Sequence, residues 1–406
     1  MPGISPRKAS FVLLRTLKSV LRGGSFEGSF RRVVRSQGLR GEGARRLFRL
    51  AYFLITYYEG LRRLASAGGL RGVEGVVKFA ALHGFSERSM LDELEELAKE
   101  VGGLRGLSLR HGFPHDVTER LSRFLRPNEI DAIYGSLNER KRWLRVVRAR
   151  ATPLEAAKCL ESEGIGATRS PFAEEALKLS DPWIPVGRLS CVRRGLVVPQ
   201  DVSSYLAASL AKPPGDLLVD MCSAPGIKLA QVLEGADALA LALDANHKRL
   251  SALQGVLART GIPPWRVIAI AADSTEIVLN GPIELALLDA PCTGTGAVYG
   301  DPTSKLRYSP ELLRRFSELQ RRLLARALAN ARRVLFMTCS ILPEEGEEIV
   351  DWALAAGLAE PEELPRRQWA SRPYRGYASE SFAIRLAPNI VDGQGFFVAM
   401  LKSKRA

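Results

Sequence analysis

The chain has 406 residues, which is long for a single domain, and 46% of them are hydrophobic, which is enough to form buried cores. It contains no run of the roughly eighteen apolar residues that a membrane-spanning helix needs. The N-terminal stretch MPGISPRKAS lacks the apolar core of a signal peptide. We therefore expect a soluble, cytoplasmic monomer without a membrane partner.

The formal net charge of +14 is concentrated near the N-terminus, where residues 1–80 contain sixteen Lys and Arg against four Glu. A concentrated basic region is typical of proteins that bind a polyanion such as RNA. Arg greatly outnumbers Lys, and its planar guanidinium suits phosphate recognition. The alternative is a solvated helical face in a basic protein.

The cysteines are scattered and form no CxxC pair. This spacing argues against a disulfide framework and against a zinc site, so we expect free thiols in a reducing compartment. His111 and His115 offer only a weak metal-ligand spacing, and we expect no metal. The five cysteines are Cys159, Cys191, Cys222, Cys292 and Cys339.

Residues 1–135 show helical periodicity and predict an all-helical domain. Ser5-Pro6 is a helix start, and apolar residues then recur at helical spacing until Gly23-Gly24. A second apolar face runs from Leu47 to Leu61, and further helical patterns cover 90–101 and 117–124. The apolar positions of the first helix are Phe11, Leu14, Leu17 and Leu21.

The pattern changes after residue 135. Residues 136–206 predict a small α/β domain, with a strand in 143–150 and a helix in 153–164. Residues 207–406 then alternate apolar strands with helices, which predicts a mostly parallel, doubly wound Rossmann-like sheet. Two closing strands, 381–386 and 395–403, lie too close together for a crossover helix and should pair antiparallel. The preceding strands are 216–220, 238–244, 266–273, 283–290 and 333–340.

In a doubly wound sheet, ligands bind at the carboxyl ends of the strands. Asp244, about two dozen residues after a Gly-containing turn, is placed to bind both hydroxyls of a ribose. The helix start after Gly226 offers free N–H groups to a carboxylate, and Asp273 can accept from an adenine amine. No GxGxxG is present, so an adenosine-bearing cofactor without pyrophosphate is indicated, and S-adenosyl-L-methionine fits.

Two of the strand ends carry cysteines, Cys292 and Cys339. Carbon 5 of cytosine becomes able to attack a sulfonium methyl once a thiolate has added to carbon 6. A carboxylic group beside the thiol can supply the hydrogen bond that the ring needs at N3, and Asp289 is well placed for this. The pair therefore indicates methylation of cytosine at carbon 5.

The motifs DMCSAPGIK, LALDANHKRL, LLDAPCTGTGA and MTCSILPEEGEE resemble those of the NOL1/NOP2/Sun (Fmu) family of RNA cytosine-5 methyltransferases. The resemblance covers about 195–406, and the helical region is similar to the NusB-like RNA-binding domain of bacterial ribosomal members. It implies rRNA, or else tRNA, as substrate. It also implies Cys339 as nucleophile, with Cys292 assisting product release and Asp289 beside the cytosine. The cofactor-binding residues that it implies are Cys222, Ser223, Ala224, Pro225, Gly226, Ile227, Lys228, Asp244, Arg249, Asp273 and Asp289.

The chain departs from the family pattern at a few positions. Ile227 stands where a second glycine is usual, and a β-branched residue would be strained there if φ were positive. Gly346 stands where Asn is common. The basic stretch 305–307, after the Pro-Cys motif, could contact phosphate or form a solvated loop.

Two other functions stay open on the sequence. A DNA cytosine-5 methyltransferase would use Cys292 as its nucleophile, but the chain lacks the Glu-Asn-Val motif of such enzymes. A non-catalytic RNA-binding or ribosome-assembly factor would carry the altered cofactor loop without binding the cofactor.

Overall fold

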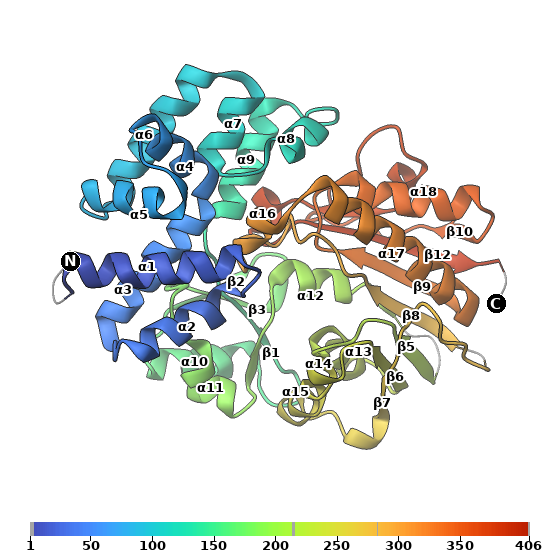
Figure 1. The fold of residues 1–406 in the computed structure, drawn as a ribbon. Coiled ribbons are helices and arrows are strands. Elements are labelled where there is room, and N and C mark those ends of the chain that lie inside the picture. Colours follow the sequence, from blue (N-terminus) through green and yellow to red (C-terminus); the bar gives the residue numbers. More distant parts are fainter. Residues whose placement is uncertain (1–3, 213–215, 282, 405–406) are drawn as a thin grey trace. The chain divides into compact units, whose positions relative to one another are not determined.

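The computed structural model describes residues 4–212, 216–281 and 283–404. The chain divides into two compact units (Figure 1). The first contains residues 1–139 and 297–310, and the second contains residues 140–296 and 311–406. A short stretch from within the C-terminal half of the sequence, 297–310, therefore belongs to the helical unit.

The first unit is helical, as the periodicity predicts. Ser5 caps its first helix by accepting a hydrogen bond from the backbone N–H of Lys8, and Pro6 occupies the first turn. The helices are α1 (Pro6–Leu21), α2 (Phe26–Ser36), α3 (Gly41–Thr56), α4 (Tyr58–Ala67), α5 (Gly72–Leu82), α6 (Glu87–Val101), α7 (Gly103–His111), α8 (His115–Leu121), α9 (Pro127–Asn138) and α16 (Thr303–Arg307).

The extent of α1 is as expected, but only part of the predicted apolar run is buried. Leu17 is buried together with Val12, Leu13 and Val20, whereas Phe11 and Leu21 are each 41% exposed. Apolar residues occur on both sides of this helix, and periodicity cannot tell which side meets the neighbouring helices. The second apolar run is buried as expected, although it is divided between α3 and α4 at Tyr57.

Lys305 in α16 corrects one expectation. Its Nζ atom donates to the carbonyl oxygens of Thr56 (3.2 Å) and His111 (2.8 Å) and to the side chain of Asn138, and it lies 4.0 Å above the ring of Phe113. The side chain is buried, so it neither contacts phosphate nor forms a solvated loop charge. Burial lowers the pKa of Lys305 well below its ordinary value.

The second unit begins with a small antiparallel sheet in the order β2-β3-β1-β4. Leu144, Val146, Leu177 and Val197 of this sheet pack under the helices that follow. The strands β2 and β3 are not evident in the sequence, because neither contains a continuous apolar run or a regular apolar–polar alternation. The elements are β1 (Trp143–Val146), α10 (Pro153–Ser162), β2 (Ala167–Ser170), β3 (Ala173–Leu179), η1 (Val186–Arg188), α11 (Ser190–Arg193) and β4 (Val197–Pro199).

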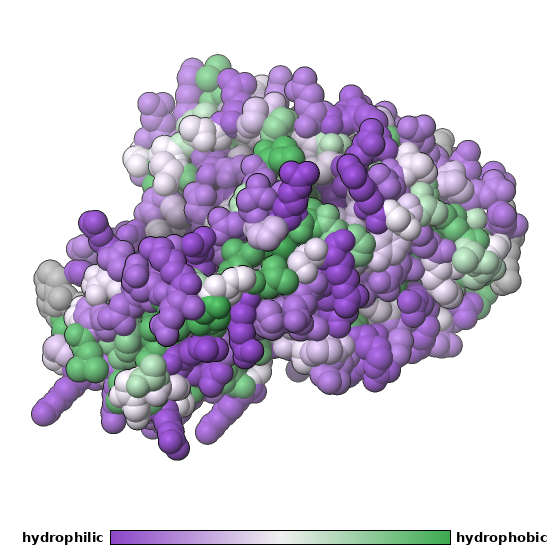
Figure 2. All heavy atoms as spheres, turned by 90° about the horizontal axis from the view of Figure 1, so that it is seen from above, coloured by the Kyte–Doolittle hydropathy of each residue, from purple (hydrophilic) through white to green (hydrophobic). Residues whose placement is uncertain are grey.

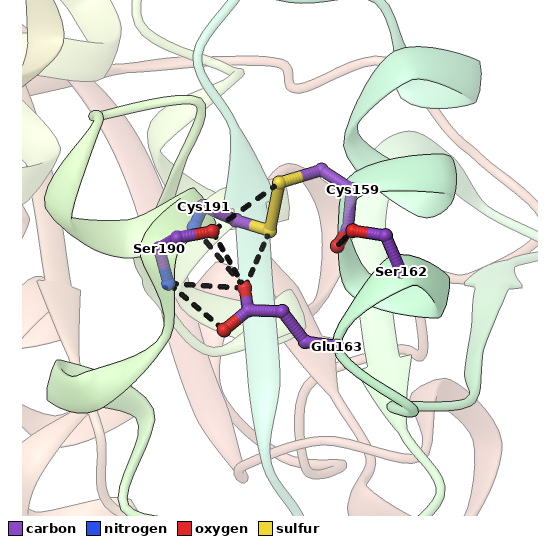
Figure 3. The surroundings of a disulfide bond; sticks show 5 residues. All are labelled: Cys159, Ser162, Glu163, Ser190 and Cys191. Atoms are coloured by element: carbon purple, nitrogen blue, oxygen red, sulfur yellow. Dashed lines mark hydrogen bonds between the residues drawn. A yellow bond between two sulfur atoms is a disulfide. The ribbon is translucent and has the colours of Figure 1, made fainter.

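The expectation that all five cysteines are free is wrong for two of them. Cys159 of α10 and Cys191 of α11 form a disulfide (Figure 3). The packing of the two helices brings these residues together, and their separation of 32 positions in the chain gives no sign of it. Glu163 lies beside the bond and accepts from the backbone N–H of Ser190 at 3.0 Å. Among the described residues, these two cysteines and Glu163 are the one set of three possible metal ligands, and the sulfurs are bonded to each other.

The large sheet has the order β10-β12-β9-β8-β5-β6-β7, and β11 pairs with β12. Strands β5 to β9 run parallel, and β12 runs antiparallel to β9, β10 and β11. The predicted fold class is confirmed, including the antiparallel pairing of the closing strands. The strands are β5 (Leu217–Asp220), β6 (Leu239–Asp244), β7 (Val267–Ala271), β8 (Ile283–Asp289), β9 (Ala331–Thr338), β10 (Ala359–Glu362), β11 (Ile384–Leu386) and β12 (Phe396–Ser403).

Helices cover both faces of this sheet (Figure 1). Alternate strand residues point to opposite faces, so that Leu218 and Leu287 pack with α12, α13 and α15, whereas Val219 and Leu288 pack with α17 and α18. Burial on both faces explains why these strands are continuous apolar runs. The helical elements are α12 (Val202–Ala208), α13 (Ile227–Glu234), α14 (His247–Leu250), α15 (Ala252–Thr260), η2 (Pro264–Arg266), α17 (Pro310–Asn330), η3 (Pro343–Glu345), α18 (Glu347–Ala355), η4 (Ala378–Ser381) and α19 (Pro388–Val391).

The helices and the molecular surface agree with the absence of a long apolar run in the sequence. None of the helices in the described parts of the chain is long and apolar enough to cross a membrane. Figure 2 shows a face on which hydrophilic residues predominate and hydrophobic residues are visible in patches between them.

The disulfide generates a stability prediction. Because the unfolded chain regains the entropy of the closed loop, which spans 32 positions, Cys159→Ser should lower the free energy of unfolding by about 4 kcal/mol. Denaturant unfolding with and without a thiol reductant measures this difference. The reductant should destabilise the wild type and leave the variant unchanged. Five titratable thiols in the unreduced, unfolded wild type would contradict the bond.

Candidate active site

The site is built where the strand order of the large sheet reverses. The order runs outward from β5 to β6 and β7 on one side, and from β8 to β9 on the other. Asp220 ends β5 and Asp289 ends β8, and these two strands are neighbours. Open α/β sheets bind ligands in the crevice at such a reversal, beyond the carboxyl ends of the strands.

The loop from β5 to α13 contains the predicted cofactor residues Cys222 to Gly226. Its backbone is held by hydrogen bonds from the N–H of Ser223 to the carbonyl oxygen of Leu243 (2.8 Å) and from the N–H of Cys222 to Oδ1 of Asp220 (3.2 Å). Gly226 has φ of +96°, and a Cβ atom there would lie 2.1 Å from Cδ1 of Leu253. A glycine is therefore required at this close approach.

Ile227 begins α13 with a negative φ, so its branched side chain causes no backbone strain. The left-handed position is Gly226, which this chain retains. The departure from the usual second glycine therefore leaves the shape of the loop intact, and Lys228 follows in the first turn of the helix.

Asp244 and Arg249 hold the same loop from the next strand. Asp244 ends β6, and its Oδ2 accepts from the N–H of Ala224 at 3.1 Å while its Oδ1 accepts from the N–H of Asn246 at 2.9 Å. Arg249 donates from Nη2 to the carbonyl oxygen of Ala224 at 2.7 Å. The structure thus places both residues against the cofactor loop.

Asp273 lies at the end of β7 and is exposed. Its Oδ1 accepts from the backbone N–H (2.9 Å) and the hydroxyl (2.8 Å) of Thr275, and these bonds lower its pKa. Its neighbour Ser274 donates to the carbonyl oxygen of Met221, which joins the end of β7 to the cofactor loop. Asp273 is therefore at the edge of the site and caps a turn there.

A half-buried ion pair lies at the reversal itself. Lys228 Nζ is 2.6 Å from Asp289 Oδ2 and 5.4 Å from the ring centre of Phe396. Burial lowers the pKa of Lys228, but the charge of Asp289 and the hydrogen bond to it outweigh burial, so the net pKa of Lys228 is raised. Lys228 therefore remains an ammonium next to the Asp289 carboxylate.

The two predicted cysteines are in contact. Cys292 Sγ and Cys339 Sγ are 3.1 Å apart, on the loops that follow β8 and β9. The hydrogen bond to Cys339, together with burial, raises the pKa of Cys292 well above its ordinary value, so Cys292 is a protonated thiol. The N–H of Gly296 donates to the carbonyl oxygen of Cys339 at 3.0 Å, and a Cβ at Gly296 would lie 2.2 Å from the backbone oxygen of Gly395. A glycine is needed there for the loops to meet.

Two functional candidates escaped the sequence analysis. Asp220 was visible as a strand end but was given no role, and its closeness to Asp289 depends on strand order. Burial and the charge of Asp289 raise its pKa to about 7. Glu345, in the motif MTCSILPEEGEE, was given no role either, and its side chain is fully buried.

Asp220 generates a pH prediction. The folded chain holds the Asp220 proton more tightly than the unfolded chain, where an Asp has a pKa of about 3.9. Its contribution to stability therefore falls as the pH rises from about 4 to about 7. Asp220→Asn, which keeps the neutral form, should lose less stability than the wild type between those pH values, as measured by denaturant midpoints. Asp273→Asn is the control, because the lowered pKa of Asp273 places its effect below pH 4. Parallel profiles for Asp220→Asn and wild type would contradict the prediction.

The strand order, the loop after the first parallel strand and the acid at the end of the second define a Rossmann-like methyltransferase fold. Residues 207–402 match the family described as "16S rRNA methyltransferase RsmB/F". This match, over just under half of the chain, confirms the resemblance of its motifs to the RsmB/F (NOL1/NOP2/Sun) family of RNA cytosine-C5 methyltransferases.

Relatives and solved structures agree with this assignment. Ribosomal RNA small subunit methyltransferase B of Xanthomonas campestris is 35% identical over 52% of this chain and 49% of its own length. The chain spans about half the length of the curated relatives it matches. A methyltransferase homolog protein from Pyrococcus horikoshii has a TM-score of 0.62 at 27% identity, over 74% of this chain and 98% of that one. The crystal structure of PH0851 covers 99% of both chains with a TM-score of 0.80 at 21% identity, which shows a shared fold.

Proposed function

We propose that this chain is an S-adenosylmethionine-dependent RNA cytosine-5 methyltransferase that acts on ribosomal RNA in the cytoplasm. The observation that carries the proposal is the 3.1 Å contact between the sulfurs of Cys292 and Cys339, beside the ion pair of Lys228 and Asp289. The family match supports the reaction, and the Xanthomonas relative, named for the small ribosomal subunit, supports the class of RNA.

The cofactor loop fits S-adenosylmethionine. When bound, this molecule supplies a methyl group on a positively charged sulfur. Asp220 and Asp289 offer carboxylates at the strand reversal, where a positive charge would be stabilised. The residues that would hold the molecule are Cys222 to Lys228, Asp244, Arg249, Asp273 and Asp289.

Cys339 acts as the nucleophile in this proposal. Its sulfur bonds to C6 of the cytosine, and the ring electrons then make C5 able to accept a methyl group. The positive charge of Lys228 attracts negative charge on the Cys339 sulfur, and this attraction contributes to the raised pKa of Lys228. Asp289 lies beside the cytosine and takes part in the hydrogen bond at N3 of the ring.

Cys292 acts in the release of the product. Water takes the C5 proton, the electrons of that C–H bond re-form the C5–C6 double bond, and the bond between Cys339 Sγ and C6 breaks so that the sulfur leaves with its electron pair. Cys292, held as a thiol 3.1 Å away, donates its hydrogen bond to the departing sulfur. The two cysteines therefore differ in role because their surroundings differ.

The helical unit supplies a surface for RNA. Arg32 and Arg35 of α2 and Arg45 and Arg46 of α3 are exposed. One guanidinium group can hydrogen-bond to two oxygens of the same phosphate, and this contact does not depend on the base sequence. The target base must also leave its stack to reach a half-buried sulfur.

Substitution of each cysteine by alanine tests the different roles proposed for Cys339 and Cys292. Cys339→Ala should reduce methyl transfer to background, because no adduct can form at C6. Cys292→Ala should form the adduct and release it slowly, so that a covalent protein–RNA band accumulates on a denaturing gel. Methyl transfer by Cys339→Ala at the normal rate would overturn the proposal, and its loss in Cys292→Ala alone would favour the DNA-type mechanism.

Calorimetry with S-adenosylmethionine separates the enzyme from a non-catalytic assembly factor. The wild type should bind, and Asp244→Ala should bind about tenfold more weakly or worse, because a carboxylate that anchors the loop is lost. Asp237→Ala, which changes an exposed acid of the same region, is the control and should bind normally. Absence of heat from the wild type at millimolar ligand would instead support the assembly factor.

A further inference from the structure

A buried carboxylate joins the two loops that carry the cysteines. Glu345 ends the short helix η3, and its side chain is inaccessible to solvent. Its Oε1 accepts from the backbone N–H of Thr293 at 2.8 Å, and its Oε2 accepts from the hydroxyl of the same residue. Thr293 directly follows Cys292, so the carboxylate holds the residue next to that cysteine by two bonds.

The same glutamate reaches the strand end that carries Cys339. Thr338 donates its hydroxyl to the backbone oxygen of Glu345 at 2.8 Å, and Ser340 hydrogen-bonds to the Glu345 side chain. These two residues flank Cys339. Glu345 is therefore bonded to the neighbours of both cysteines, and it contacts neither the cofactor loop nor the Lys228–Asp289 pair in any described bond.

Gln320 of α17 completes the arrangement. Its Nε2 donates to Oε1 of Glu345 at 3.2 Å and to the carbonyl oxygen of Pro291 at 2.8 Å. Pro291 directly precedes Cys292, so the Cys292 loop is fixed on both sides of the cysteine. Gln320 is itself fully buried.

Packing leaves Glu345 little room to move. A Cβ atom at Gly346 would lie 2.8 Å from Cγ of Phe397, so the backbone after Glu345 lies directly against that ring. A side chain at position 346, where Asn is common in the family, would require that ring to shift. A buried carboxylate with several satisfied hydrogen bonds is costly to rearrange, and it fixes the groups that it binds.

We propose that Glu345 is a positioning residue that sets the separation of the Cys292 and Cys339 sulfurs, and that this separation decides how fast the RNA adduct is released. The second half of this statement rests on the proposed function, whereas the first half depends only on the geometry. A displacement of about 1 Å between reacting groups can cost about a hundredfold in rate.

The separation of the sulfurs can be measured without RNA or cofactor. Diamide takes two hydrogen atoms from a pair of thiols and leaves a disulfide, with the diamide reduced to its hydrazine. The rate at which Cys292 and Cys339 become cross-linked, followed by peptide mass spectrometry, therefore reports their proximity. The Cys159–Cys191 peptide serves as an internal standard.

Two matched pairs of variants separate positioning from folding. Glu345→Ala removes the acceptor, whereas Glu345→Gln keeps Oε1 and places an amide against the Thr293 hydroxyl. Thr293→Val removes that hydroxyl, whereas Thr293→Ser keeps it. Glu345→Ala and Thr293→Val should cross-link about tenfold more slowly than the wild type or worse, and Glu345→Gln and Thr293→Ser should restore the rate to within about threefold. Glu360→Ala, which alters an exposed acid of β10, should match the wild type.

The possible outcomes test the geometric half and the functional half of the proposal separately. Wild-type cross-linking in folded Glu345→Ala would overturn the proposal. If thermal melting shows Glu345→Ala to be unfolded, the Thr293 pair decides, and equal rates for Val and Ser overturn the proposal. With RNA and cofactor, the slow cross-linkers should accumulate the covalent adduct as Cys292→Ala does. Slow cross-linking with normal adduct release would overturn only the functional half. Failure of the Cys339→Ala test would overturn the proposed reaction and leave the cross-linking result standing.

Discussion

The reversal of strand order between β5 and β8 is the constraint on which the site depends. Parallel strands all end at the same edge of a sheet, and the helices that follow β5 and β8 leave on opposite faces. The reversal therefore opens a space beyond two neighbouring strand ends, Asp220 and Asp289. The cofactor loop occupies one side of this space, and the loop that carries Cys292 begins on the other. Every predicted site residue except Asp273 contacts one of these loops or belongs to it.

The acidic side chains at this edge of the sheet lie close to one another and to a lysine, so their charges affect one another. Asp220 and Asp289 are close enough for the charge of one to raise the pKa of the other, and Lys228 neutralises Asp289. A site that holds two carboxylates around one ammonium has a net negative charge when Asp220 is ionised. This charge suits a cationic ligand, and it would be unfavourable for the pyrophosphate of a dinucleotide, which agrees with the absence of a GxGxxG motif.

The two cysteines show how neighbours give identical side chains different properties. Cys292 is held as a thiol by its contact with Cys339, by burial and, to a smaller extent, by the charge of Glu345. Cys339 instead interacts with the charge of Lys228, and this interaction contributes to the raised pKa of that lysine. The sequence contains both cysteines in recognisable motifs, but the difference between them arises from groups that lie 47 positions and more apart in the chain.

The sequence by itself determined the parallel strands and the antiparallel closing pair, and it predicted the loop and the two cysteines that lie at the strand reversal. These features rest on local signals, since strands buried on both faces must be continuously apolar and a tight loop must keep Gly226. Only the tertiary structure decided which face of α1 is buried, that Cys159 meets Cys191, that Lys305 is buried and that Glu345 joins two loops. Each of these depends on contacts between segments distant in the chain, and a polar side chain looks the same in sequence whether it faces water or satisfies buried hydrogen-bond partners.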